Sequence, residues 1–123
     1  MSIHFHVSKL QRIVYLRYLK NPTVEEFQTT MKQVFAHPDF SPGFSFLVDR
    51  SKVKPTDAEY MHGAVDFTRV HRLEMSGRWA VVIFGTAAYG LARMGQLMTQ
   101  SLGIRVKIFA DFAEAENWLL SPE

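Results

Sequence analysis

The sequence predicts an α/β fold with a mixed, mainly parallel sheet and helices packed against it. Short runs of β-branched and aromatic residues alternate with longer amphipathic segments along the chain. The first two strand-like segments follow each other directly, which predicts an antiparallel hairpin. The later strands are separated by helices, which predicts parallel pairing through right-handed crossovers. The expected order of elements is β-β-α-β-α-β-α-β-α.

A hairpin and a helix are expected first. Residues 3–7 alternate apolar and polar side chains, as a half-exposed strand does, and residues 12–19 are rich in β-branched and aromatic side chains. Thr23 and Glu26 have the spacing of a capping box, which predicts a helix start. The helix should end at His37, because Pro follows it.

A strand and a second helix are expected next. Residues 44–49 form the third strand, whose last residue, Asp49, is an acid at the point where the sheet gives way to a loop. Thr56 and Glu59 have the spacing of another capping box, so we expect the second helix to begin there. Its core-facing stripe begins with Tyr60 and Met61 and runs out near Leu73.

The C-terminal part of the chain completes the alternation. Residues 78–84 form the fourth strand, which is apolar without interruption from Trp79 to Phe84, as is typical of a central strand covered on both faces. We expect Thr86 to cap the following helix and Gly103 to end it. Residues 104–109 form the last strand, and Asp111 begins the last helix.

Composition limits the classes of protein that the chain can represent. Its 123 residues fit a single domain spanning residues 1–123. The net charge is only +2 and the basic residues are dispersed, so no nucleic-acid surface is expected. Without cysteine there is no disulfide or thiolate metal site, which suits the cytoplasm. The longest continuous apolar run, residues 79–84, is far too short to span a bilayer.

The order of elements resembles the SpoIIAA-like, or STAS-type, family, over essentially the whole chain. This family includes anti-sigma-factor antagonists and a branch of small stand-alone proteins. Two segments carry the resemblance: FLVDRSKV at residues 46–53, and TAAYGLARMGQ at residues 86–96, which is similar to a helix opening of the stand-alone branch. At the level of the fold, the family is also similar to the CRAL-TRIO domains that exchange lipids. The resemblance therefore implies a SpoIIAA-like fold and a regulatory or ligand-binding role.

In the anti-sigma-factor antagonists, a partner kinase phosphorylates a serine at a helix start after the third strand. The corresponding positions of this chain hold Ala58 and Glu59, and neither residue can accept a phosphoryl group. Ser51 and Thr56 remain as alternative acceptors nearby.

The start of the helix near Thr86 is a candidate anion site. This helix has no acid in its first turn, and the side chains of Tyr89 and Arg93 should lean back toward its positive end. A phosphate or carboxylate would be stabilised there. In the alternative interpretation, Thr86 alone caps the helix, Tyr89 packs on a strand edge, and Arg93 pairs with Asp49 or Asp111.

The same helix carries a stripe of small residues, namely Ala88, Ala92, Gly95 and Thr99. Such a stripe is typical of close helix packing. The alternative is that two helices separate there and leave an adaptable apolar pocket. The residues expected to line that pocket are Met61, Phe67, Met94 and Met98.

A basic loop follows the third strand and contains Arg50, Lys52 and Lys54. It is either solvated surface or a weak contact with anionic lipid head groups at a membrane surface. In the second case, nearby apolar side chains would assist the contact, either Val53 or the pair Phe40 and Phe44.

Catalysis and bound metal are not expected. His4 and His6 lie on one strand face, but no third ligand stands at a recognisable spacing. The chain has no GxSxG elbow and no glycine-rich nucleotide loop. We therefore expect neither an enzyme nor a cofactor.

Together these features predict a non-enzymatic, cytoplasmic domain that binds a lipid or another apolar or anionic ligand, in peripheral contact with a membrane. The residues expected at the ligand are Asp49, Ser51, Thr56, Thr86, Tyr89 and Arg93. The alternative is a protein-interaction module of the anti-sigma-factor antagonist type, with or without phosphorylation. The sequence leaves the oligomeric state open, a homodimer included.

Overall fold

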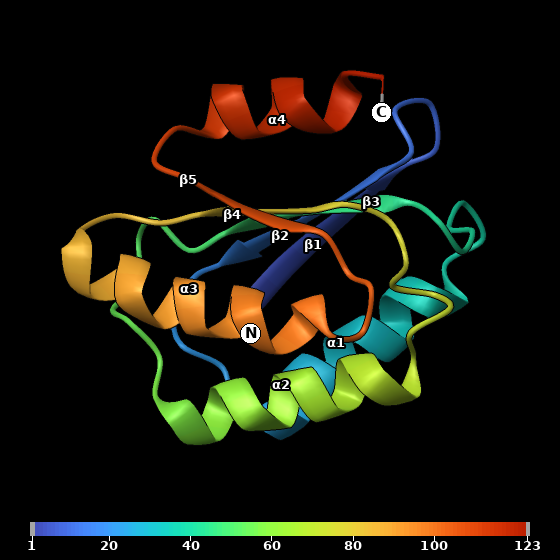
Figure 1. The fold of residues 1–123 in the computed structure, drawn as a ribbon. Helices are drawn as coiled ribbons and strands as arrows, with labels where there is room; N and C mark the ends of the chain where they lie inside the picture. The colour runs from blue at the N-terminus through green and yellow to red at the C-terminus, as the bar shows by residue number, and fades with distance from the viewer. Residues whose placement is uncertain (1, 123) are drawn as a thin grey trace.

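The computed structural model describes residues 2–122 and has the predicted order of elements. In chain order the elements are β1 (Ile3–Ser8), β2 (Ile13–Tyr18), α1 (Val24–Ala36), β3 (Ser45–Asp49), α2 (Ala58–Val70), β4 (Trp79–Val82), α3 (Thr86–Gln100), β5 (Val106–Phe109) and α4 (Phe112–Leu120). Figure 1 shows them arranged around a single sheet.

The five strands are ordered β1-β2-β3-β4-β5 across the sheet. β1 pairs with β2 in the antiparallel sense, and every later pair is parallel, as the spacing of strands and helices predicts. β4 is an interior strand, as its continuous apolar run indicates, although β3 holds the middle of the sheet. The carboxyl ends of β3 and β4 are adjacent, because Asp49 pairs with Val82.

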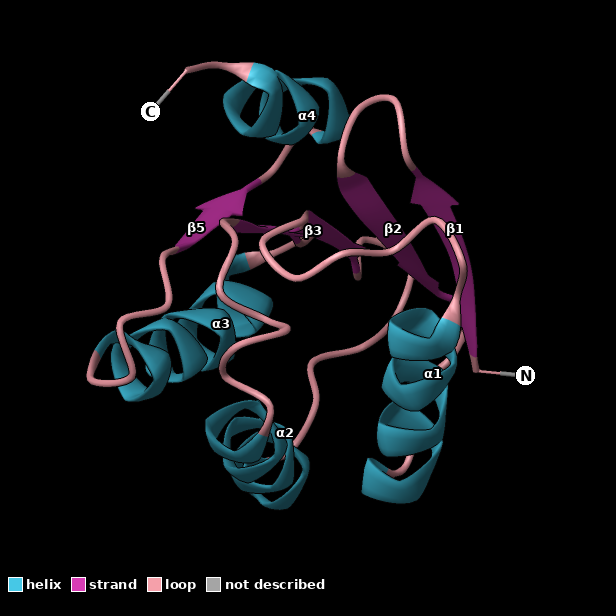
Figure 2. Ribbon diagram, turned by 90° about the vertical axis from the view of Figure 1, so that its right-hand side faces the viewer, coloured by secondary structure: helices cyan, strands magenta, loops and turns pink. Residues whose placement is uncertain are grey.

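The helices cover both faces of the sheet unequally. α1, α2 and α3 lie on one face, and α4 lies alone on the other (Figures 1 and 2). Alternate residues of the strands therefore enter two different cores. The core beneath α1, α2 and α3 includes Val14, Leu16, Met31, Val34 and Phe46, whereas the core beneath α4 consists of Ile13, Leu47, Ala80, Val82, Ala115 and Leu119.

Two of the predicted helix starts are confirmed. Thr23 and Glu26 form the complete capping box of α1, with the side chain of each accepting a hydrogen bond from the other's backbone N–H. Asp111 caps α4 by accepting a hydrogen bond from the backbone N–H of Glu114. Gly103 follows α3 with a φ of +77°, as expected for the glycine that terminates a helix.

The other two predicted caps are wrong. α2 is capped by Asp57, which accepts from the N–H of Tyr60, so Thr56 lies just outside the helix. The Asp57 side chain supplies an oxygen acceptor three residues before Tyr60, which is the spacing that an N-cap requires. α3 is preceded by Gly85, whose φ of +94° suits only glycine, and Thr86 is the first helical residue without a capping bond.

Candidate functional site

An apolar cavity of about 160 Å³ lies between α2, α3 and the sheet. The sheet lines it with Tyr18, Val48, Trp79, Val81 and Val106; α2 with Tyr60, Met61, Ala64, Val65 and Thr68; and α3 with Ala88, Leu91, Ala92, Gly95, Gln96 and Thr99. The loop after β3 closes one end with Arg50, Val53, Lys54, Pro55 and Thr56. Lys54 and Pro55 are exposed, so the cavity reaches the surface at that end.

Small side chains on α3 create this space. Ala88, Ala92, Gly95 and Thr99 all line the cavity, which favours the pocket interpretation of this stripe over close packing along its whole length. Packing is tight at Gly95, where an added Cβ would lie 3.1 Å from the sulfur of Met61. The stripe therefore leaves a gap between α3 and its neighbours, with Gly95 as the point of closest approach to α2.

Of the four residues predicted to line the pocket, Met61 does so and the other three do not. Phe67 faces α1 instead and packs against the rings of Phe27 and Phe35. Met94 and Met98 are half-buried on α3 but outside the cavity wall. The prediction was wrong for the two methionines because the cavity is faced mainly by the small residues of α3, with only Leu91 from its apolar stripe.

One end of the cavity is polar. The hydroxyl groups of Tyr18 and Tyr60 lie 3.0 Å apart and hydrogen-bond to each other, although both residues are buried. Burial raises the pKa of both hydroxyls above the usual value of a tyrosine. Tyr60 was expected only as a core residue of α2. A phenol in a core needs a polar partner, and that requirement was the signal available in the sequence.

The guanidinium group of Arg50 lies over the ring of Tyr18, one member of this pair. Its centre is 4.7 Å from the centroid of the Tyr18 ring, in a cation–π contact. Nη2 donates to Oδ1 of Asn21 at 2.7 Å and, at 3.4 Å, to the backbone oxygen of Lys54. The ion pairs found within residues 2–122 involve other side chains, so no carboxylate there neutralises Arg50.

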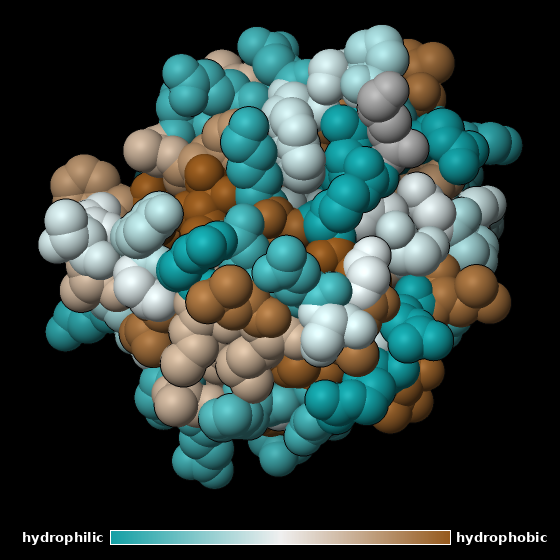
Figure 3. All heavy atoms as spheres, viewed as in Figure 1, coloured by the Kyte–Doolittle hydropathy of each residue, from teal (hydrophilic) through white to brown (hydrophobic). Residues whose placement is uncertain are grey.

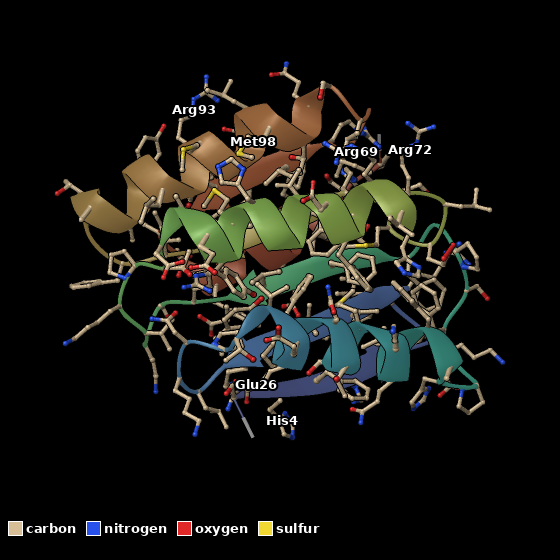
Figure 4. All side chains as sticks on the ribbon, turned by 90° about the horizontal axis from the view of Figure 1, so that it is seen from below. His4, Glu26, Arg69, Arg72, Arg93 and Met98 are labelled. Carbon is tan, nitrogen blue, oxygen red and sulfur yellow. The ribbon has the colours of Figure 1, made fainter. Side chains whose placement is uncertain are left out.

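The predicted anion site at the start of α3 is not assembled as expected. Tyr89 is about half exposed, and Arg93 donates to the side chain of Gln96 on its own helix. Figure 4 shows Arg93 on the side of α3 that faces away from α2. Neither Asp49 nor Asp111 pairs with Arg93 in the described part of the chain.

The other predicted site residues lie on opposite faces of the sheet. Asp49 borders a groove beside α4 together with Tyr15 and Phe112. Its Oδ1 accepts hydrogen bonds from the backbone N–H and the hydroxyl of Ser51, the latter at 2.6 Å. Thr56 lines the apolar cavity on the other face. The six residues predicted around one ligand therefore do not form a single site.

The basic loop differs from the prediction in the surroundings of its apolar residues. Val53 is half-buried against the larger core, while Lys52 and Lys54 are exposed. Phe44 is 2% exposed and precedes β3, at the opposite end of the strand from the loop. Phe40 is half-buried and packs against its ring, so this pair lies away from the basic loop.

Neither a cluster of metal ligands nor a membrane-spanning helix is found among residues 2–122. Within residues 2–122, no group of three or more histidine and acidic side chains is close enough to hold a metal ion. Among the helices of the same residues, none has the length and apolar character needed to cross a bilayer. On the side shown in Figure 3, polar and apolar residues intermingle, with apolar side chains visible between α3 and α4.

Comparisons with known proteins define the fold. No protein-family model matches the chain, and a search of curated proteins finds no match. Among solved structures, it is similar to an uncharacterised protein of the DUF3478 family, with a SpoIIAA-like fold, from Shewanella loihica PV-4. The two share 17% identity over 95% of this chain and 91% of the other, with a TM-score of 0.67. The chain thus has a SpoIIAA-like fold, as its sequence resemblance implies.

Proposed function

We propose that this protein binds a small apolar or amphipathic molecule in the cavity between α2, α3 and the sheet, and that it does so without catalysing a reaction. One observation supports this above the others. The cavity is lined by apolar side chains over most of its surface. It opens to solvent beside the loop after β3, which contributes the polar residues Arg50, Lys54 and Thr56. Ligand sites in proteins commonly combine an apolar wall with a few polar groups in this way.

The size of the cavity suggests the size of the molecule. Protein interiors are normally packed without voids of this kind, because unfilled space forfeits dispersion contacts. An engineered apolar cavity of about 150 Å³ takes up benzene. The 160 Å³ present here would accordingly suit a ring or a short chain of about six carbon atoms.

The structure also suggests how a ligand would enter. α3 has no fully buried residue, unlike α1, α2 and α4, and no side chain caps its first turn. Such a helix is held by fewer apolar contacts than its neighbours and is the element expected to move most readily. Movement of α3 away from α2 would widen the cavity without disturbing the sheet.

The chain supplies its own fluorescent reporter for a binding test. It contains two tryptophans: Trp79 lines the cavity, and Trp118 packs on the α4 side of the sheet. Trp118→Phe would therefore leave Trp79 as the single indole. We expect 1-hexanol and hexanoate to change the emission of Trp79 in a saturable manner.

A matched pair of variants on α3 tests the location. Ala92 lines the cavity, whereas Ala87 is exposed and does not. Ala92→Leu should weaken binding of both probes at least about tenfold, because added methyl groups occupy the site, and should raise the free energy of unfolding by about 1 kcal/mol. Ala87→Leu should change neither quantity appreciably. Equal affinities in the two variants, or no binding by the parent, would contradict the proposal.

A further inference from the structure

We infer that the bound molecule carries a carboxylate, which is held by Arg50, Tyr18 and Tyr60 at the loop end of the cavity. This inference rests on the proposed function, because it assigns a head group to the molecule whose apolar part occupies the same cavity. None of these three residues belongs to the anion site that the sequence predicts at the start of α3. Three properties of the cavity end support the inference: its hydroxyl protons, its guanidinium group and its charge.

The hydroxyl protons of the tyrosine pair exceed the acceptors around them. Tyr18 and Tyr60 bring two O–H protons, and their mutual hydrogen bond uses one. Arg50 offers only donors to this pair. The mutual hydrogen bond gives each tyrosine oxygen a partner. The O–H proton that this bond does not use has no protein acceptor within residues 2–122. Tyr18 is 4% and Tyr60 9% exposed, so an acceptor supplied by a ligand would satisfy a buried donor.

The guanidinium group is positioned but not neutralised. Asn21 and the backbone oxygen of Lys54 both accept from Nη2, while the Tyr18 ring supports the plane of the group. The Tyr18 hydroxyl also accepts from the guanidinium group. A guanidinium group has five N–H donors, so some of them remain for a ligand beside these three acceptors. A guanidinium edge matches the two oxygens of a carboxylate.

Charge favours an anionic head group over a neutral one. The residues that line the cavity include Arg50 and Lys54 but no aspartate or glutamate. The acids nearest in sequence are engaged elsewhere: Asp49 faces the α4 side of the sheet, and Asp57 caps α2. One carboxylate would balance the charge of Arg50, while its chain would extend between α2 and α3 toward Ala92 and Trp79.

The experiment compares two probes of equal chain length, hexanoate and 1-hexanol, in the Trp118→Phe background at neutral pH. We expect hexanoate to bind about tenfold more tightly than 1-hexanol, as charge-assisted hydrogen bonds predict. Arg50→Gln should weaken hexanoate about tenfold and change 1-hexanol less than about twofold. The double variant Tyr18→Phe with Tyr60→Phe should also weaken hexanoate more than 1-hexanol, because it removes both O–H protons of the pair.

Lys52→Gln is the matched control, because it removes the same charge from an exposed position in the same loop outside the cavity wall. It should leave both affinities within about twofold. Arg50→Lys provides a second variant should Arg50→Gln fold poorly, and circular dichroism and thermal unfolding verify each variant. The lysine keeps the charge but loses the guanidinium fork, so hexanoate should bind with intermediate affinity.

The outcomes separate this inference from the proposed function. Equal binding of hexanoate and 1-hexanol, with no selective effect of Arg50→Gln, would overturn the carboxylate site and leave the apolar cavity intact. Equal losses in Lys52→Gln and Arg50→Gln would also overturn it, since the general charge of the loop would then explain the preference. No binding of either probe would overturn both proposals.

Discussion

A buried pair of phenol groups illustrates how one residue can serve both the core and the site. Tyr60 lies on the apolar face of α2, with its ring edge-to-face against Phe27. Its hydroxyl meets that of Tyr18 at the polar end of the cavity. Burial raises the pKa of both groups, because the charged phenolate would lose hydration that the cavity does not replace. This property makes stability depend on pH in the alkaline range.

The direction of the pH dependence follows from linkage. A folded-state pKa above the unfolded value of about 10 stabilises the protein fully below pH 10, and this stability is lost as pH rises further. Each such tyrosine should lower the free energy of unfolding by about 1.4 kcal/mol per pH unit above that point. Tyr60→Phe should therefore show a shallower decline between pH 9 and 11 in urea unfolding. An unchanged decline would contradict the assignment.

Arg78 shows a structural role that its position before β4 does not reveal. Its guanidinium donates to the backbone oxygens of Trp118, Leu119 and Ser121, and it also stacks on the ring of Trp118. These oxygens belong to the C-terminal end of α4, where a cation is favoured. A residue 40 positions away thereby attaches α4 to the sheet.

At the scale of elements, the helices differ in how they begin. Thr23, Asp57 and Asp111 each accept a backbone N–H, and each of these helices has an acid in its first turn. α3 has neither feature. Its start is preceded by a glycine whose positive φ brings the chain from β4 into the helix. The absence of a first-turn acid, which is visible in the sequence, thus indicates the least stabilised helix rather than an assembled anion site.

Substitutions at these helix starts should have unequal effects on stability. Asp57→Ala and Asp111→Ala remove a capping hydrogen bond and should each lower the free energy of unfolding by about 1 kcal/mol. Thr86→Ala and Thr56→Ala remove no capping bond and should stay within about 0.5 kcal/mol of the parent. Chemical denaturation measures all four. A cost at Thr86 equal to that at Asp57 would show that Thr86 does cap α3.

At the scale of the whole molecule, the three helices on one face share a core that is incomplete. α1 and α2 contribute buried aromatic and aliphatic residues, whereas α3 contributes small side chains and none that are fully buried. The cavity is therefore a property of the layer formed by α2, α3 and the sheet. A molecule placed there would supply the contacts that α3 lacks, so binding and the stability of α3 should be coupled.

Hydrogen exchange measures that coupling. In the free protein, we expect amides of α3 to exchange faster than those of α1, because fewer buried contacts hold α3. Saturating hexanoate should slow exchange in α3 and in the facing part of α2. It should leave α4 unchanged, because α4 lies on the other face of the sheet (Figure 2). Uniform slowing over all four helices would indicate global stabilisation and contradict local coupling.

Much of the fold was determined by local sequence. The alternation at residues 3–7, the capping box of Thr23 with Glu26, the cap at Asp111 and the glycine after α3 all act between neighbours in the chain. The order of elements and the sense of strand pairing were predicted from these signals. The caps of α2 and α3 were each misplaced by one residue. At α2 the neighbouring Asp57 offers an oxygen acceptor like that of Thr56, and at α3 the N-cap position is held by Gly85.

Only the tertiary structure decided the composition of the candidate site. The strand period of two places Val48 on the cavity side of the sheet and Asp49 on the α4 side, and this separates residues that the sequence predicts together. Tyr18, Arg50 and Tyr60 come from a strand, a loop and a helix, and their meeting depends on how α2 packs on the sheet. The sequence alone determines which residues are apolar, small or charged. Packing determines which of them face a common space, because that depends on contacts between elements distant in the chain.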